Sequence, residues 1–277
     1  MKKILKLIIE LLNFPQTVTL LLRYHEIIRL LTWRDFLARF RGSIFGVLWV
    51  FVQPLLMMIA YTLVFSYFLK VRFGSNDSPF VFSVYLLCGL VPWNSFNEGI
   101  NLSCSLLRAH SNLVKKVIFP VEVLPVNLTL VTLIQQVIGL VLLFVFVLYV
   151  EGTIHWAVIL IPLLLIFQFL FQTGLSWIVA SLSVFVPDVR QAVSLLTLLL
   201  MFITPIMYPE NLVPKKLNFL LILNPMAQII GMYRRLLMEG RLPAIEQLIG
   251  VSVFSVLVWM VGYVWFNRTK HMFSDYL

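Results

Sequence analysis

The stretch IFGVLWVFVQPLLMMIAYTLVFSYF, residues 44–68, decides the fold class of this chain. Its 25 residues include no charged side chain. A helix that crosses a bilayer needs about 20 mostly apolar residues, because each residue rises about 1.5 Å through a hydrocarbon core about 30 Å thick. The stretch is therefore long enough to span a membrane as one helix.

The rest of the chain repeats this pattern. Of its 277 residues, 61% are hydrophobic and only 12% are charged, with a mean hydropathy of +0.97, whereas about a quarter of a soluble domain is charged. We predict an all-α polytopic membrane protein in which one domain (1–277) holds a cytoplasmic segment (1–43), a six-span bundle (44–266) and a cytoplasmic tail (267–277). The six predicted spans are 44–68, 80–104, 121–150, 154–185, 191–207 and 247–266.

The distribution of Lys and Arg predicts the orientation. Cytoplasmic loops of membrane proteins carry an excess of these residues. With both ends of the chain inside, the cytoplasmic segments hold 14 of them and the external segments hold 7. We therefore expect the N- and C-termini in the cytoplasm.

The stretch HSNLVKKVIFPVEVLP (110–125) lies on the cytoplasmic elbow between the second and third predicted spans. Residues 105–116 fit a short helix with one apolar side, and the prolines at 120 and 125 restrict the backbone that follows. Such a helix can transmit force from a protein below the membrane; a plain positive-charge anchor is the alternative. The candidate coupling residues are Arg108, His110, Ser111, Asn112, Leu113, Lys115 and Lys116, with Asp188 and Arg190 of the next cytoplasmic turn.

Residues 23–41 predict an amphipathic helix in the membrane interface. Leu30, Trp33, Leu37 and Phe40 recur at helical spacing, and basic residues fall largely on the other faces. A basic helix with an aromatic-rich apolar face is typical of the interface. The candidate interface residues are Arg29, Trp33, Arg34, Asp35, Arg39 and Arg41.

Residues 211–240 predict two short re-entrant helices outside, between spans five and six. Asn224 followed by Pro225 is a typical helix start, and Gly240 a typical stop. The intervening helix would rise about 22 Å, less than the bilayer core. We expect the pair to ring the exit of a channel, with anchoring of span six as the alternative. The candidate channel or gate residues are Trp49, Tyr61, Phe65, Tyr208, Phe219, Met226 and Tyr233.

Motifs for chemistry are missing from the sequence. No glycine is followed by lysine, so there is no phosphate-binding GxxxxGK[ST] loop, and no HExxH or CxxC motif suggests a metal. Glu98, flanked by three asparagines, is the only acid well inside a predicted span, and a proton path there is the weaker interpretation. Gln168, Gln172 and Ser176 form a stripe expected to bond between helices. We expect a chain that is not an enzyme, holds no cofactor and binds no nucleic acid.

Several motifs together resemble the ABC-2 type permeases that export polysaccharides. They are RDFLARFRGSIFGVLWVFVQPLL (34–56), LVPWNSFNEGI (90–100), SNLVKKVIFPVEVLP (111–125), VPDVRQ (186–191) and TPIMYPENLVP with LNPM (204–226). The resemblance covers residues from about 24 onward and is greatest to the O-antigen exporters of the Wzm type, with teichoic acid and capsule permeases as close relatives.

The resemblance implies a homodimer in the bacterial cytoplasmic (inner) membrane, in contact with membrane lipids and paired with two copies of a separate ATPase that binds ATP and Mg²⁺. The elbow would seat in that ATPase, and a lipid-linked polysaccharide would pass between the two permease subunits through an aromatic-lined tunnel. An ion-coupled secondary transporter and a membrane-embedded biosynthetic enzyme are the alternatives from other classes. The sequence does not distinguish O-antigen from capsule or teichoic acid.

Overall fold

The computed structural model describes residues 14–68, 80–115 and 119–277, and this part of the chain contains helices and no strand. The predicted all-α membrane architecture is confirmed. The bundle consists of α4 (Trp49–Thr62), α5 (Phe80–Ala109), α7 (Val123–Glu151), α8 (Ile161–Phe185), α9 (Val189–Ile203) and α12 (Ile245–Thr269). The shorter α-helices are α2 (Phe14–Arg23), α3 (His25–Ala38), α6 (Ser111–Val114), α10 (Asn218–Leu223), α11 (Pro225–Arg234) and α13 (Phe273–Tyr276).

The predicted fifth span is shorter than expected. Among the described residues, five helical segments are long and apolar enough to cross a membrane: Gly46–Phe65, Phe80–Ala109, Val123–Glu151, Trp156–Phe185 and Ile245–Tyr276. By contrast α9 has 15 residues, which rise about 22 Å. It ends at Thr204, whose backbone is extended, because the residue before a proline disfavours the helical conformation. The six-span arrangement therefore contains one helix shorter than the bilayer core.

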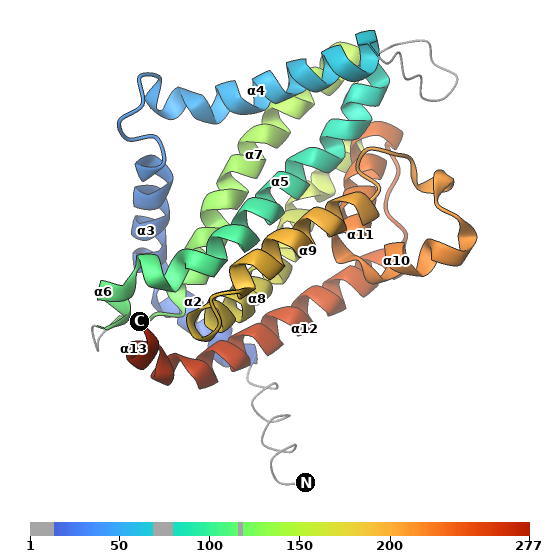
Figure 1. Cartoon of the computed structure of the whole chain (residues 1–277). Helices are drawn as coiled ribbons and strands as arrows, with labels where there is room; N and C mark the ends of the chain where they lie inside the picture. Colours follow the sequence, from blue (N-terminus) through green and yellow to red (C-terminus); the bar gives the residue numbers. More distant parts are fainter. Residues whose placement is uncertain (1–13, 69–79, 116–118) are drawn as a thin grey trace.

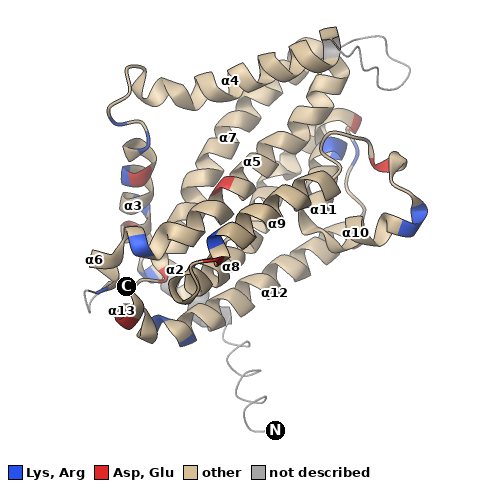
Figure 2. Cartoon of the chain, viewed as in Figure 1, with Lys and Arg blue, Asp and Glu red and all other residues tan. Residues whose placement is uncertain are grey.

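The two ends of the bundle carry different short elements (Figure 1). At one end α3 lies across the bundle, close to α2, α6, α13 and the end of the chain. At the opposite end lie α10 and α11, where α9 ends and α12 begins. Figure 2 shows most charged residues gathered at these two ends, with few along the helices between them. Both ends of the described chain thus lie at the same end of the bundle.

The packing of α8 against α12 depends on two glycines. A Cβ atom on Gly262 would lie 2.2 Å from the carbonyl oxygen of Gly174, and one on Gly174 would lie 2.5 Å from that of Val258. Both distances are shorter than any van der Waals contact, so a side chain at either position would push the helices apart. Small residues allow this close approach between membrane helices, where dispersion contacts replace the hydrophobic effect.

Buried amide side chains join α5, α7 and α8 inside the bundle. Gln136 and Gln168 exchange two hydrogen bonds of 2.9 and 2.8 Å, and Gln172 donates to the Thr132 hydroxyl over 2.9 Å. The Ser176 hydroxyl bonds to a serine of α5 over 2.6 Å. All three members of the predicted polar stripe are fully buried, which confirms its role in bonding between helices.

Candidate functional site

A strip of polar side chains runs along the one side of α5 that its neighbours leave open. Asn94, Asn97, Glu98 and Asn101 recur at i, i+3, i+4 and i+7, so they share one face of the helix. None of the four is buried, although most of α5 is. Amide groups both donate and accept hydrogen bonds, and a carboxylate accepts them. The strip therefore offers both hydrogen-bond donors and hydrogen-bond acceptors to a polar ligand at the depth of the membrane.

Two members of the strip, Asn94 and Glu98, line a groove between α4, α5 and α7, whereas Asn101 bonds to Asn97 and to Thr197 of α9. Polar side chains from all three helices line the groove: Gln53 of α4, Asn94 and Glu98 of α5, and Gln135 of α7. Methionines and Tyr61 of α4 supply the apolar part of the lining. This combination fits a ligand that has many hydroxyl groups and also apolar ring faces, because amides bond the hydroxyls and an aromatic ring packs on the faces.

The structure brings only one of three predicted channel aromatics of the first span into this groove. Tyr61 lines it. Trp49 instead packs edge-on against Phe45, with ring centroids 5.6 Å apart, and Phe65 stacks on Tyr61 at 6.4 Å. The groove of the single chain is lined by amides more than by aromatic rings.

Arg39, at the end of α3, connects the interface helix to the groove. Its Nη1 donates to Glu98 Oε1 over 2.5 Å and to Gln135 Oε1 over 2.7 Å. One turn earlier Asp35 accepts a 2.6 Å hydrogen bond from the Asn127 amide of α7. The carboxylate of Glu98 is therefore paired with a cation, which suits an anchoring role better than a proton path.

These bonds also set which side of α3 packs against the bundle. Ile28, Leu31 and Phe36 are buried, whereas Leu30 and Trp33 are 65% and 60% exposed. The reason is that α3 turns the side carrying Asp35 and Arg39 toward α7, and the predicted apolar face then points partly away from the bundle. Three further predicted interface residues lie at the surface: Arg29 pairs with Glu26, Arg34 pairs with Asp35, and Arg41 is exposed.

The predicted coupling helix is divided between two elements. Helix α5 continues without a break to Ala109, and the single turn of α6 follows after His110, whose non-helical backbone separates them. Arg108 is held by the Ser183 carbonyl, over 3.1 Å. Leu113 is half-buried. The other coupling candidates are Ser111 (half-buried), the exposed Asn112 and Lys115, the exposed Asp188 and Arg190 between α8 and the first turn of α9, and Lys116, which lies outside the described residues.

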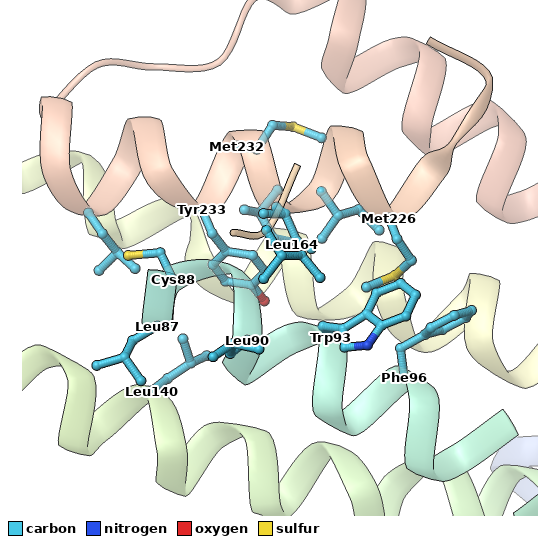
Figure 3. Packing of buried hydrophobic residues seen from close by; sticks show 14 of the residues in the cluster. Leu87, Cys88, Leu90, Trp93, Phe96, Leu140, Leu164, Met226, Met232 and Tyr233 are labelled. Atoms are coloured by element: carbon cyan, nitrogen blue, oxygen red, sulfur yellow. The ribbon is translucent and has the colours of Figure 1, made fainter. Parts of the chain in front are cut away.

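The start and the end predicted for the second short helix are found in the structure. The predicted gate residues, however, fall into two groups: some are buried, and others lie nearer the surface. The Asn224 side chain accepts from two backbone amides of α11 and so caps that helix, and Gly240 ends the following turn with φ 64°. Met226 and Tyr233 are buried and point from α11 toward α5, near Trp93 (Figure 3). They belong to the core of this subunit and not to a rim.

Two other gate candidates lie nearer the surface. Phe219 of α10 is 52% exposed. Tyr208 is half-buried; its hydroxyl donates to the carbonyls of Phe202 and Ile203 over 2.8 and 3.0 Å. Partial burial raises the pKa of this phenol, so it keeps the proton that it donates. It thereby caps the end of α9.

Sequence reasoning missed Arg234, a buried arginine in α11. Its guanidinium donates to the carbonyls of Pro205 and Ile206 over 2.6 and 2.9 Å, and it lies 3.5 Å from the centroid of the Tyr85 ring. These contacts join α11 to α5 and to the end of α9. The sequence does contain a sign of this site. Arg234 lies inside an apolar helix with a predicted cap, and a buried charge there requires hydrogen-bond partners within the protein.

Metal and thiol chemistry have little support in the described part of the chain. There, no group of three or more His, Cys, Asp or Glu side chains is placed to hold a metal ion. Cys88 and Cys104 are free thiols and both are buried.

The chain is similar to known membrane proteins over most of its length. Residues 26–238 match the family described as ABC-2 type transporter. The chain is 31% identical over 253 residues (90% of this chain, 95% of the relative) to the O-antigen export system permease protein RfbA of Myxococcus xanthus. A protein of the same name from Klebsiella pneumoniae is 28% identical over 91% of this chain and 95% of the relative. The polysialic acid transport protein KpsM of Escherichia coli is 24% identical over 83% of this chain and 88% of the relative. This chain belongs to the ABC-2 type transporter family.

Proposed function

We propose that this chain is the membrane subunit of an ABC exporter that moves a lipid-linked O-antigen polysaccharide across the bacterial inner membrane, driven by a separate ATPase. The observation that carries the proposal is the open polar strip of α5. Polar groups at membrane depth are costly and mark the path of a polar cargo. The near full-length similarity to permeases named for O-antigen export supplies the class of that cargo.

A second copy of the chain would complete the path. The strip lies on α5, and both α4 and α9 contact this helix. Both flanking helices expose apolar residues that this subunit does not cover: Phe51, Leu55 and Ile59 of α4, and Leu195, Leu199 and Phe202 of α9. A homodimer that joins these faces would enclose two polar strips between two apolar seams. The polysaccharide would then pass between the subunits.

The ATPase would act at the end of the bundle that carries α3, α6 and the turn near Asp188 and Arg190. In this arrangement two ATPase copies bind ATP and Mg²⁺, and this chain performs no catalysis. At the opposite end, Phe219 and Leu223 are 52% and 71% exposed. Both are available to close the exit of the channel between substrates.

Reconstitution with the ATPase tests the proposal. The complex in liposomes should move lipid-linked O-antigen only when ATP is hydrolysed. Asn97→Leu should reduce export and leave the ATPase bound, because it removes one amide from the strip. The matched control is Asn267→Leu, an exposed asparagine at the cytoplasmic end of α12. Export that follows an ion gradient without the ATPase would instead show a secondary transporter.

Capsule export is the second candidate, and the similarity to KpsM favours it. The two candidates differ in the glycan and share the mechanism. Offering lipid-linked O-antigen, capsular polysaccharide and teichoic acid in separate liposome preparations distinguishes them by which glycan is exported.

A further inference from the structure

The residues after α12 fold back onto the bundle. A 3₁₀ turn (Lys270–Met272) follows α12, and α13 (Phe273–Tyr276) packs against both α8 and α6. Figure 1 shows α13 and the end of the chain beside α6, at the end of the bundle where α3 lies. A segment expected to be a simple cytoplasmic tail is therefore part of the packed structure.

Aromatic contacts join this segment to the end of α8. Phe273 is fully buried, and its ring centroid lies 5.3 Å from that of Phe266 and 5.9 Å from that of Phe185. Tyr276 packs edge-on against Phe185 at 5.0 Å. Because Phe185 is the last residue of α8, these contacts hold the start of the cytoplasmic turn at 186–188.

An ion pair joins the same segment to the elbow. The Lys270 ammonium contacts the Glu122 carboxylate, and Glu122 is only 5% exposed. Glu122 immediately precedes α7, and its backbone carbonyl accepts a 3.0 Å hydrogen bond from the Trp177 indole of α8. A buried carboxylate requires a partner, since breaking a buried pair leaves an uncompensated charge. Lys270 therefore stabilises the end of the elbow by pairing with Glu122.

The apolar residues of the elbow belong to the same cluster. Phe266 and Phe273 share one buried core with Leu106 and Leu107 at the end of α5 and with Val123 at the start of α7. The segment 266–277 thus touches both sides of the elbow and, through Phe185, the next cytoplasmic turn.

We propose that residues 266–277 form a strut that holds the described parts of the elbow (105–115 and 119–125) and the turn 186–188 as one rigid body. Lys270 and Phe273 are positioning residues, and they touch neither substrate nor nucleotide. This inference rests on the proposed function, because a rigid elbow affects transport only if the ATPase applies force at this end of the bundle. With the strut in place, a push on α6 moves α5, α7 and α8 together. Without it, the push is absorbed by local bending of the elbow.

A charge exchange between Lys270 and Glu122 tests the strut. The complex of each variant with the ATPase is assayed in liposomes for polysaccharide exported per ATP hydrolysed. Lys270→Glu and Glu122→Lys should each lower this ratio about tenfold while ATP hydrolysis continues, and the double variant should restore it. His271→Glu makes a similar change at an exposed neighbour and should leave the ratio unchanged. Single variants with a normal ratio, or a double variant no better than the singles, would overturn the proposal.

A second measurement does not depend on transport. Amide hydrogen exchange of residues 105–115 in the purified chain should speed up in Lys270→Glu and return to the parental rate in the double variant. Unchanged exchange in Lys270→Glu would refute the strut even if export per ATP were lowered. If the parental complex exports no polysaccharide, the proposed function fails, and the exchange rates still decide the strut.

Discussion

Replacing Arg39 with methionine would test whether the interface helix is fixed to the groove through one side chain. Methionine keeps an apolar stem but removes the guanidinium. The change leaves Glu98 without the cation that lies 2.5 Å from it, and leaves the Gln135 carbonyl without a donor at 2.7 Å. Helix α3 would then keep its polar link to α7 only through Asp35 and Asn127.

The structure sets the size of the effect. A buried hydrogen bond to a charged group contributes about 1.5–3 kcal/mol, whereas an exposed ion pair contributes about 0–1 kcal/mol. The Arg39 and Glu98 side chains are 21% and 42% exposed, so solvent screens the pair. We therefore expect about 1 kcal/mol for the ion pair and about 0.5 kcal/mol for the partly solvated hydrogen bond from the guanidinium to the Gln135 amide. The variant should be destabilised by about 1.5 kcal/mol.

A double-mutant cycle isolates the pair. The free energy of unfolding in detergent is measured for the parent, Arg39→Met, Glu98→Gln and the double variant. The coupling energy should be about 1 kcal/mol. Arg41→Met, an exposed arginine two residues further along, serves as control and should change stability by less than about 0.5 kcal/mol. If the effects of the two variants add within about 0.3 kcal/mol, the contact does not fix α3 to α5.

The remaining predictions concern packing, coupling and orientation. Gly262→Val should destabilise the chain by at least about 2 kcal/mol in thermal unfolding, since its Cβ would lie 2.2 Å from a backbone oxygen. The control is Gly250→Ala on the same helix: its Cβ would meet nothing within 4 Å, and the change should be neutral. Leu113→Asp should abolish export and weaken ATPase pull-down while the chain still inserts; normal export would leave the elbow as an anchor only. In intact cells a membrane-impermeant thiol reagent should label a cysteine at Asn211 and not one at Asn112, and the opposite pattern would invert the orientation.

The sequence was sufficient for the elements that follow from local rules. Apolar runs located the long helices, and the cap at Asn224 and the stop at Gly240 lie where predicted. Both depend only on neighbouring residues. The buried stripe through Gln168 and Gln172 was also predictable, because polar groups at helical spacing in an apolar span require partners.

The side of α3 that packs on the bundle and the burial of α11 could not be predicted in the same way. Leu30 and Trp33 fit the apolar face of an interface helix, but hydrogen bonds to residues far away in the sequence decide which other side of α3 faces the bundle. Similarly, Tyr233 resembles a rim aromatic until Gln136 of α7 is seen to donate to its hydroxyl. Hydrogen bonds between helices far apart in the sequence decide which side of α3 faces the bundle and whether Tyr233 is buried. The periodicity of apolar residues within one helix does not reveal such bonds.

The buried Arg234 has a consequence for how the protein is made. Charged groups enter a bilayer at high cost unless partners are present. The partners of this guanidinium, at Tyr85, Pro205 and Ile206, all precede it in the chain. They are therefore synthesised before the arginine itself. Its guanidinium can be hydrogen-bonded by carbonyls that were added to the chain earlier, and insertion of this hairpin does not have to wait for α12.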